Sequence, residues 1–262
     1  MTLHESRLMR HPIVFRRVQV LQVLDLGPHM RRIVVGGPEL EGFHSGAPDD
    51  HIKVFFPNPE GEYVTPAPGP DGPVYPADKP PSPMRDYTPR LHDVAAGTLA
   101  VDFVLHGDGP ASDWARDVRV GDDFAFGGPR GSFVPAADFD HYVLAGDETA
   151  LPAIGRWLEE MPAGCRATVL VEIPEDADRQ DITTRADVQV RWLPRNGARA
   201  EQSGLLEAAL DEASPEGDAF WWIACESRRS RGMRKSLETR GVPKDWIRST
   251  GYWKHSAGAD DE

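Results

Sequence analysis

The first half of the chain alternates short apolar, β-branched runs with glycine and proline, a pattern that predicts strands. Six runs are expected to be strands: residues 13–20, 30–35, 51–56, 85–90, 98–106 and 123–126. Short strands with this punctuation favour a small antiparallel β-barrel. Residues 57–90 are rich in proline, and this composition predicts a long loop.

From about His141 the pattern changes to apolar runs that alternate with helical periods. Strands are expected at residues 142–145, 168–173, 188–193 and 220–225, and helices at residues 150–161, 204–213 and 230–240. This alternation predicts a parallel sheet with helices on both faces. The two patterns divide the chain into domains at residues 1–136 and 137–262, the second with a C-terminal tail.

The composition narrows the class of protein. A net charge of −13 argues against binding to nucleic acid or to an anionic membrane. The sequence has no apolar run long enough for a membrane span and no apolar N-terminal segment typical of a secretory signal. Two cysteines, Cys165 and Cys225, fit free thiols in a reducing compartment, so we expect a cytoplasmic protein.

Two segments carry candidate chemistry. In an extended strand, Arg85 and Tyr87 share one face, and with the Thr88 backbone they could serve one flat, phosphorylated ligand. About twenty residues later, Gly109–Ser112 form a turn of small residues whose amides can approach a pyrophosphate. A ring to stack on, a hydrogen bond and a phosphate nest are what a flavin dinucleotide needs.

Read in order, five motifs resemble the siderophore-interacting protein family of flavin-dependent ferric-siderophore reductases, within the ferredoxin-reductase superfamily. They lie at residues 85–90, 106–115, 128–131, 146–154 and 251–254. The resemblance implies a six-stranded antiparallel FAD-binding β-barrel followed by a Rossmann-like α/β domain that binds NAD(P)H. Electrons would pass from NAD(P)H through FAD to chelated Fe(III), releasing Fe(II) for iron acquisition. Some members of the family accept electrons from ferredoxin, which stays open as an alternative reductant, and we expect a monomer.

The resemblance assigns roles to residues. Tyr87 would stack on the isoalloxazine and Thr88 would hydrogen-bond near N5, so both are expected to act in catalysis, while Arg85 would bind a flavin phosphate. The other cofactor-binding residues are expected to be Asp86, His106, Gly109, Pro110, Ala111, Ser112 and Trp114 for FAD, and Gly146, Asp147, Glu148, Thr149 and Ala150 for the nicotinamide nucleotide. Trp114 could instead pack in the following helix, and His106 could be a structural histidine.

The nicotinamide cofactor is left open between NADH and NADPH. Glu172 ends a strand about where a carboxylate binds a ribose 2′-hydroxyl, which favours NADH. Arg228, Arg229 and Arg231 could clamp a 2′-phosphate, which favours NADPH, or could simply be solvated. Thr149 could contact a phosphate or cap the helix that follows it.

The substrate iron arrives already chelated, and the sequence shows no metal-ligand spacing, so no protein metal site is expected. An anionic chelate needs nearby cations, and the candidates are Lys53, Arg130 and Lys254. Lys254 stands where many relatives carry arginine, and Arg130 could bind a flavin phosphate instead. Two other functions stay open: a flavin reductase or diaphorase that serves a protein partner, and a non-catalytic siderophore-binding protein.

Overall fold

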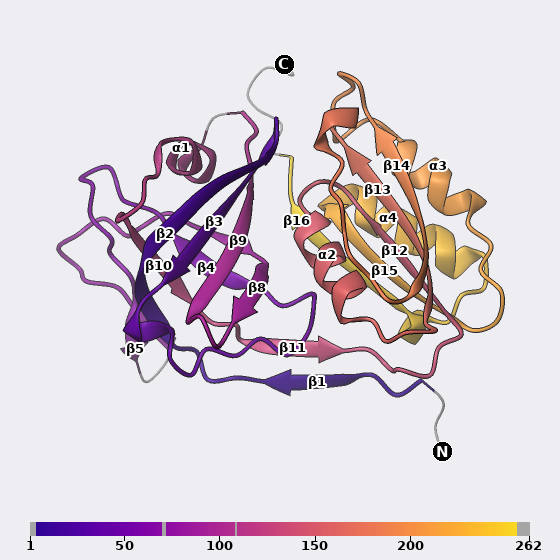
Figure 1. The fold of residues 1–262 in the computed structure, drawn as a ribbon, viewed down its shortest axis with the longest axis horizontal. Coiled ribbons are helices and arrows are strands. Elements are labelled where there is room, and N and C mark those ends of the chain that lie inside the picture. The colour runs from indigo at the N-terminus through magenta and orange to yellow at the C-terminus, as the bar shows by residue number, and fades with distance from the viewer. Residues whose placement is uncertain (1–3, 70–71, 108, 256–262) are drawn as a thin grey trace. The chain divides into compact units, whose positions relative to one another are not determined.

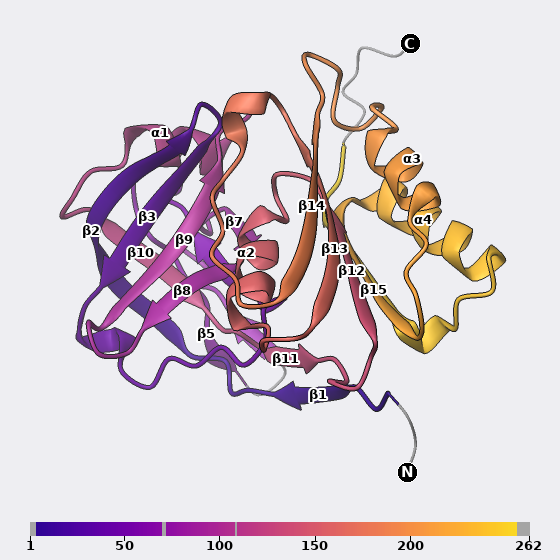
Figure 2. The ribbon, with the colours of Figure 1, turned by 45° about the vertical axis from the view of Figure 1, so that its right-hand side comes forward.

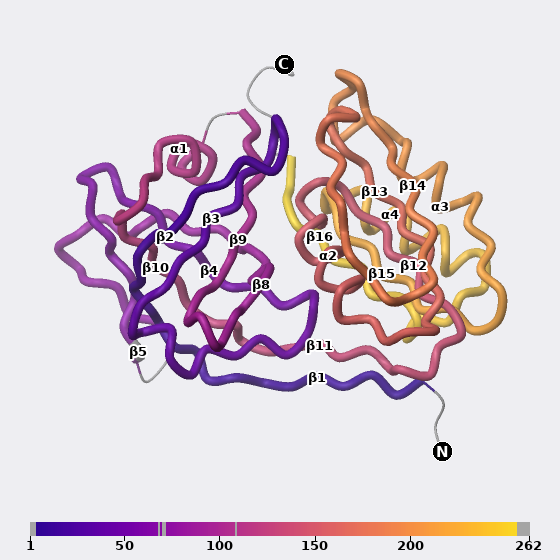
Figure 3. Tube along the Cα trace, in the orientation of Figure 1, coloured from indigo at the N-terminus to yellow at the C-terminus, as the bar shows by residue number. Residues whose placement is uncertain are grey.

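The computed structural model describes residues 4–69, 72–107 and 109–255. They form two compact units, Arg7–Val134 and the part from Pro135 onward together with the residues before Arg7 (Figure 1). Figure 3 follows the chain from one unit into the other. No helix in the described residues is long and apolar enough to cross a membrane.

A curled antiparallel sheet of seven strands makes up most of the first unit, in the order β7-β4-β10-β2-β3-β9-β8. These strands are β2 (Phe15–Gly27), β3 (Met30–Gly36), β4 (Ile52–Phe55), β7 (Met84–Tyr87), β8 (Pro89–Asp93), β9 (Thr98–Val104) and β10 (Asp123–Gly127). The antiparallel barrel architecture is confirmed. In detail the sheet differs from the expected six-stranded barrel, because it is a half-barrel with seven strands.

The predicted strand at residues 85–90 is two strands that meet at Thr88. β7 pairs with β4, whereas β8 pairs with β9, so the two outer strands of the sheet are joined through Thr88. Pro89 follows directly, and a proline has no amide hydrogen with which to continue a ladder. The chain therefore passes at Thr88 from one edge of the curled sheet to the other.

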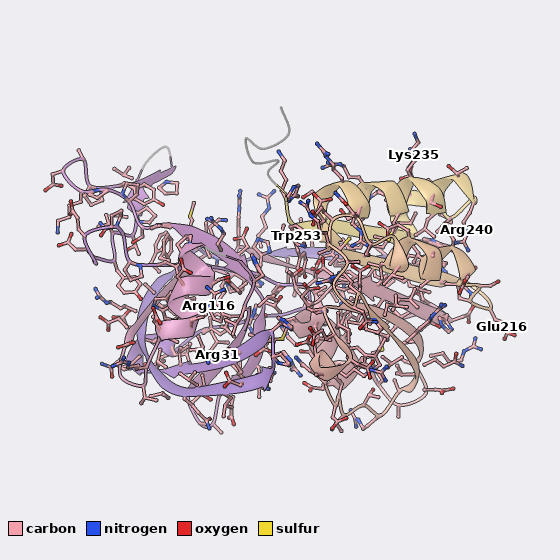
Figure 4. The ribbon with its side chains drawn as sticks, turned by 90° about the horizontal axis from the view of Figure 1, so that it is seen from above. Arg31, Arg116, Glu216, Lys235, Arg240 and Trp253 are labelled. Atoms are coloured by element: carbon pink, nitrogen blue, oxygen red, sulfur yellow. The ribbon has the colours of Figure 1, made fainter. Side chains whose placement is uncertain are left out.

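Three smaller elements complete the first unit. β1 (Arg7–Arg10) pairs antiparallel with β11 (Gly131–Val134), and neither was expected from the sequence. The region expected to be a plain loop contains a short hairpin, β5 (Ala67–Gly69) with β6 (Gly72–Val74), as well as β7. Helix α1 (Pro110–Asp117) packs on β9, and Arg31 of β3 donates to the carbonyl groups of Ala115 and Arg116 at its C-terminal end (Figure 4).

A parallel five-stranded sheet organises the second unit, in the order β14-β13-β12-β15-β16. Figure 2 shows α2 on one face and α3 with α4 on the other, which confirms the predicted architecture. The elements are β12 (His141–Gly146), α2 (Leu151–Glu160), β13 (Arg166–Ile173), β14 (Asp187–Pro194), α3 (Leu205–Glu212), β15 (Ala219–Glu226), α4 (Ser227–Thr239) and β16 (Ile247–Trp253). The sequence did not predict β16.

The order of these strands creates a switch point. The chain builds outward from β12 through β13 to β14, and then returns to place β15 and β16 on the other side of β12. Ligands of open parallel sheets bind at the carboxyl ends of the strands, where the strand order reverses. That position lies between the ends of β12 and β15.

Candidate functional site

The register of β7 places its two key side chains on one face. Arg85 lies opposite Val54 and Tyr87 lies opposite Ile52, and both partners are fully buried. Because directly paired residues share a face of the sheet, Arg85 and Tyr87 lie on the same face of β7, where Arg85 is exposed and Tyr87 is half-buried. The sharing of a face predicted for these two residues is therefore confirmed, while Thr88 lies in the buried crossing between β7 and β8.

Tyr87 rests on an aromatic floor that the sequence did not reveal. Its ring centre lies 4.2 Å from that of Phe103 and 6.4 Å from that of Phe56. Burial raises the pKa of the Tyr87 phenol, so its hydroxyl stays protonated at neutral pH. The floor comes from β9 and from the residue after β4, so only tertiary packing assembles it.

Helix α1, which follows the small-residue turn, packs against the same two phenylalanines. Trp114 packs its ring 5.5 Å from Phe103 and 5.7 Å from Phe56, centre to centre, which supports the packing interpretation of this residue. Gly109 precedes the helix at φ 148°, and a Cβ there would meet nothing within 4 Å. Two motifs that lie apart in the chain are thus brought together against Phe103 and Phe56.

The motifs are residues 85–90 and 106–115, and both contribute a ring that packs against Phe103 and Phe56. The other predicted residues of the second motif differ in exposure: His106 and Pro110 are exposed, Gly109 and Ala111 are half-buried and Ser112 is buried.

The basic side chains differ in whether they form an ion pair with a carboxylate. Lys53 forms an ion pair with Asp86, at 2.7 Å between Nζ and Oδ1, so each largely cancels the charge of the other. Arg85 donates to the Met84 carbonyl, and its guanidinium contacts no carboxylate in the part of the chain that the structure describes. Arg130 and, in the other unit, Lys254 are exposed and likewise form no ion pair with a described residue.

The turn after β12 is tightly packed. A Cβ on Gly146 would lie 2.5 Å from the Cβ of Ala150 and 2.8 Å from the Ala224 carbonyl oxygen, so only glycine fits. Thr149 donates its backbone N–H and its hydroxyl to Asp147, at 3.0 and 2.5 Å. No side chain caps α2. Thr149 therefore satisfies Asp147 in this structure and does not cap the helix.

A buried network of charged side chains joins the carboxyl ends of the strands. Glu148 forms a bidentate pair with Arg195, with both distances 2.6 Å. Arg229 donates to both oxygens of Glu172, at 2.9 and 2.7 Å, and also to Glu207. No sequence pattern pointed to Arg195, because a lone arginine after a strand has many common roles.

This network changes how Glu172 and the arginines are interpreted. Glu172 is fully buried and also accepts from the Ser203 hydroxyl at 2.7 Å, so it is fully engaged within the protein. Arg229 is buried with it, whereas Arg228 and Arg231 are exposed and form no ion pair with a described residue. The Glu226 side chain accepts hydrogen bonds from two backbone amides at the start of α4, so these amides are already satisfied within the protein.

Asp147 is fully buried at the switch point. Its second oxygen accepts from the indole N–H of Trp253, the last residue of β16, at 2.8 Å. Burial, followed by the nearby Glu148 carboxylate, raises the pKa of Asp147 to about 7. The predicted Gly146–Ala150 turn and the closing Tyr-Trp-Lys motif are thus brought into direct contact.

Comparisons with known proteins agree with this architecture. Residues 19–133 match the siderophore-interacting FAD-binding domain, and residues 139–256 match the siderophore-interacting protein model. An NADPH-dependent ferric-chelate reductase of Escherichia coli is 33% identical over 94% of this chain and 95% of its own. The ferric vibriobactin reductase ViuB of Vibrio cholerae is 32% identical over 86% of this chain and 84% of its own.

Solved structures give the same result. A siderophore utilization protein from T. fusca superposes with a TM-score of 0.90 at 35% identity, covering 98% of this chain and 99% of the other. The match therefore extends through both units and is supported by sequence and by fold. The chain belongs to the siderophore-interacting protein family.

Proposed function

We propose that this protein is an FAD-dependent reductase that passes electrons from a nicotinamide nucleotide to ferric iron held in a siderophore. The observation that carries the proposal is the combination, in one chain, of two elements. One is a strand whose Tyr87 packs on Phe103 and whose Arg85 pairs with no carboxylate of a described residue, and the other is a parallel sheet whose strand order reverses beside β12. The printed names of the E. coli and V. cholerae relatives support the same reaction.

The residues of the first unit fit FAD. Arg85 has a guanidinium free to bind a phosphate, and Gly109 leaves open space where a pyrophosphate could approach the backbone. Phe103 packs against the Tyr87 ring and holds it in place, and the isoalloxazine would stack on that tyrosine ring. Bound FAD supplies the conversion between two-electron hydride chemistry and single-electron transfer. The protein side chains bind and orient it, and none is required as a general base.

The ferric chelate would be attracted by local positive charge on an acidic protein. Because Lys53 is paired with Asp86, Arg130 and Lys254 are the stronger candidates for this role. Reduction would free the metal, since hard oxygen ligands hold ferrous iron far more weakly than ferric iron.

NADPH is the electron donor that we propose. Glu172, which could otherwise select NADH through the ribose 2′-hydroxyl, is fully engaged with Arg229 and Ser203. Arg228 and Arg231 are exposed and available for a 2′-phosphate. Ferredoxin as an alternative donor, a monomeric state, a cytoplasmic location and the domain limits 1–136 and 137–262 stay predictions.

The test is reduction of a ferric siderophore by the purified protein with NADPH, followed by trapping of Fe(II) with a coloured chelator. The protein should be yellow, and Arg85→Ala should weaken FAD binding about 10- to 100-fold, which corresponds to the roughly 1.5–3 kcal/mol of a charge-assisted hydrogen bond. Arg119→Ala, at an exposed arginine of the same unit, is the matched control. Activity toward free flavin alone would favour the diaphorase, and a colourless protein that binds the chelate would favour the carrier.

A further inference from the structure

The last strand of the sheet ends in an indole that is tied to a buried carboxylate. Trp253 donates its ring N–H to one oxygen of Asp147, while Thr149 donates twice to the other. No lysine or arginine contacts Asp147 in the described ranges. Three neutral donors therefore satisfy this carboxylate, and one of them is the only polar group of the Trp253 side chain.

The backbone of Trp253 is held as well. Its carbonyl accepts from the Ser227 hydroxyl at 2.8 Å, at the start of α4. Gly251 lies so close to Ser227 that a Cβ there would overlap the serine side chain. With the backbone fixed, the direction of the indole depends on its side-chain rotamer, and the bond to Asp147 selects that rotamer.

We propose that Asp147 is a positioning residue that fixes the Trp253 ring at the carboxyl edge of the sheet as one wall of the nicotinamide site. The inference rests on the proposed function for the identity of the ligand. Trp253, labelled in Figure 4, is only partly buried, which leaves part of the residue accessible to a ligand. It stands beside the switch point, where nucleotides bind in open parallel sheets.

Protonation of Asp147 should weaken the hydrogen bond that orients the Trp253 ring. The charged groups around Asp147 are Glu148 in the same turn and Arg195 beyond β14. The Cys225 thiol of β15 is also close, and burial raises its pKa, so it is neutral. Lys254 follows Trp253 but is exposed. An ionised Asp147 accepts a charge-assisted hydrogen bond from the indole, whereas the neutral acid accepts a weaker one. The ring should therefore be held more firmly as pH rises through about 7.

Three variants test the pair: Asp147→Asn, Trp253→Phe and the double variant. An asparagine can accept through its oxygen only, so it cannot satisfy both Thr149 and Trp253. Each single variant should lower kcat about tenfold, with little change in KM for NADPH, because the ring would position the nicotinamide and not the rest of the nucleotide. The double variant should be no slower than either single one.

A second measurement does not depend on turnover. Tryptophan emission of the FAD-bound protein, titrated from pH 6 to 8, should show a transition near pH 7 that is absent from both single variants. Independent, multiplying losses of kcat, or a transition that survives in Trp253→Phe, would overturn the inference. If Asp147→Asn does not fold, Trp253→Phe alone decides through its kcat and its emission. If the emission results hold but no ferric chelate is reduced, the proposed function fails while the positioning of Trp253 stands.

Discussion

Glu172→Gln is expected to destabilise the C-terminal unit without changing the preferred nicotinamide cofactor. The carboxylate is fully buried and accepts from Arg229 through both oxygens, from Ser203 at 2.7 Å and from Arg195 at 3.4 Å. A glutamine removes the charge and turns one acceptor into a donor that faces other donors. Breaking a buried ion pair by removing one partner costs about 3–5 kcal/mol. At about 2–4 °C per kcal/mol, the melting temperature should fall by roughly 6–20 °C.

Tryptophan fluorescence on heating is a suitable assay, because six of the seven tryptophans lie after residue 135 and so report on this unit. Glu212→Gln is the matched control. Glu212 pairs with Arg191 at 2.5 Å, but both side chains are more than half exposed, so the loss should stay below about 1 kcal/mol. The ratio of kcat/KM for NADPH to that for NADH should be the same in both variants and in the unchanged protein.

A different outcome would restore the ribose-binding interpretation of Glu172. If Glu172→Gln melts like the control while its preference shifts toward NADPH by tenfold or more, the carboxylate contacts the cofactor and the network is not its main role. A fall in stability together with an unchanged preference would establish Glu172 as a structural anchor.

Tyr87→Ala should slow flavin reduction and also lower the stability of the first unit, because its ring packs 4.2 Å from Phe103 and aromatic pairs contribute about 1 kcal/mol beyond burial; a wild-type flavin spectrum in this variant would refute the stacking role. Arg130→Gln combined with Lys254→Gln should raise KM for an anionic ferric siderophore more than for a neutral one, and the difference should shrink at 1 M salt, where the Debye length is about 3 Å. Equal effects on both chelates would count against electrostatic recognition. Burial alone would lower the pKa of His4, but hydrogen bonds to two aspartates raise it. The contribution of His4 to stability should therefore be present at low pH and lost as pH rises above about 6.5. Thermal melting of His4→Ala at pH 5.5 and at pH 8 should show the larger loss of stability at pH 5.5.

The sequence by itself determined the class of each half of the chain. Period-two runs broken by glycine and proline specify an antiparallel sheet, and apolar runs alternating with helical periods specify a parallel one. It also determined that Arg85 and Tyr87 share a face, because alternation along a strand is a local property. These features need no knowledge of distant residues.

Only the tertiary structure decided which groups are free to act. Lys53 is paired with Asp86 and Glu172 is paired with Arg229, and neither pairing can be read from the sequence. The contact between Trp253 and Asp147 joins residues 106 positions apart, and no local pattern encodes it. Charge and hydrogen-bonding capacity can be read from a residue type, but whether they are already satisfied depends on neighbours that only folding supplies.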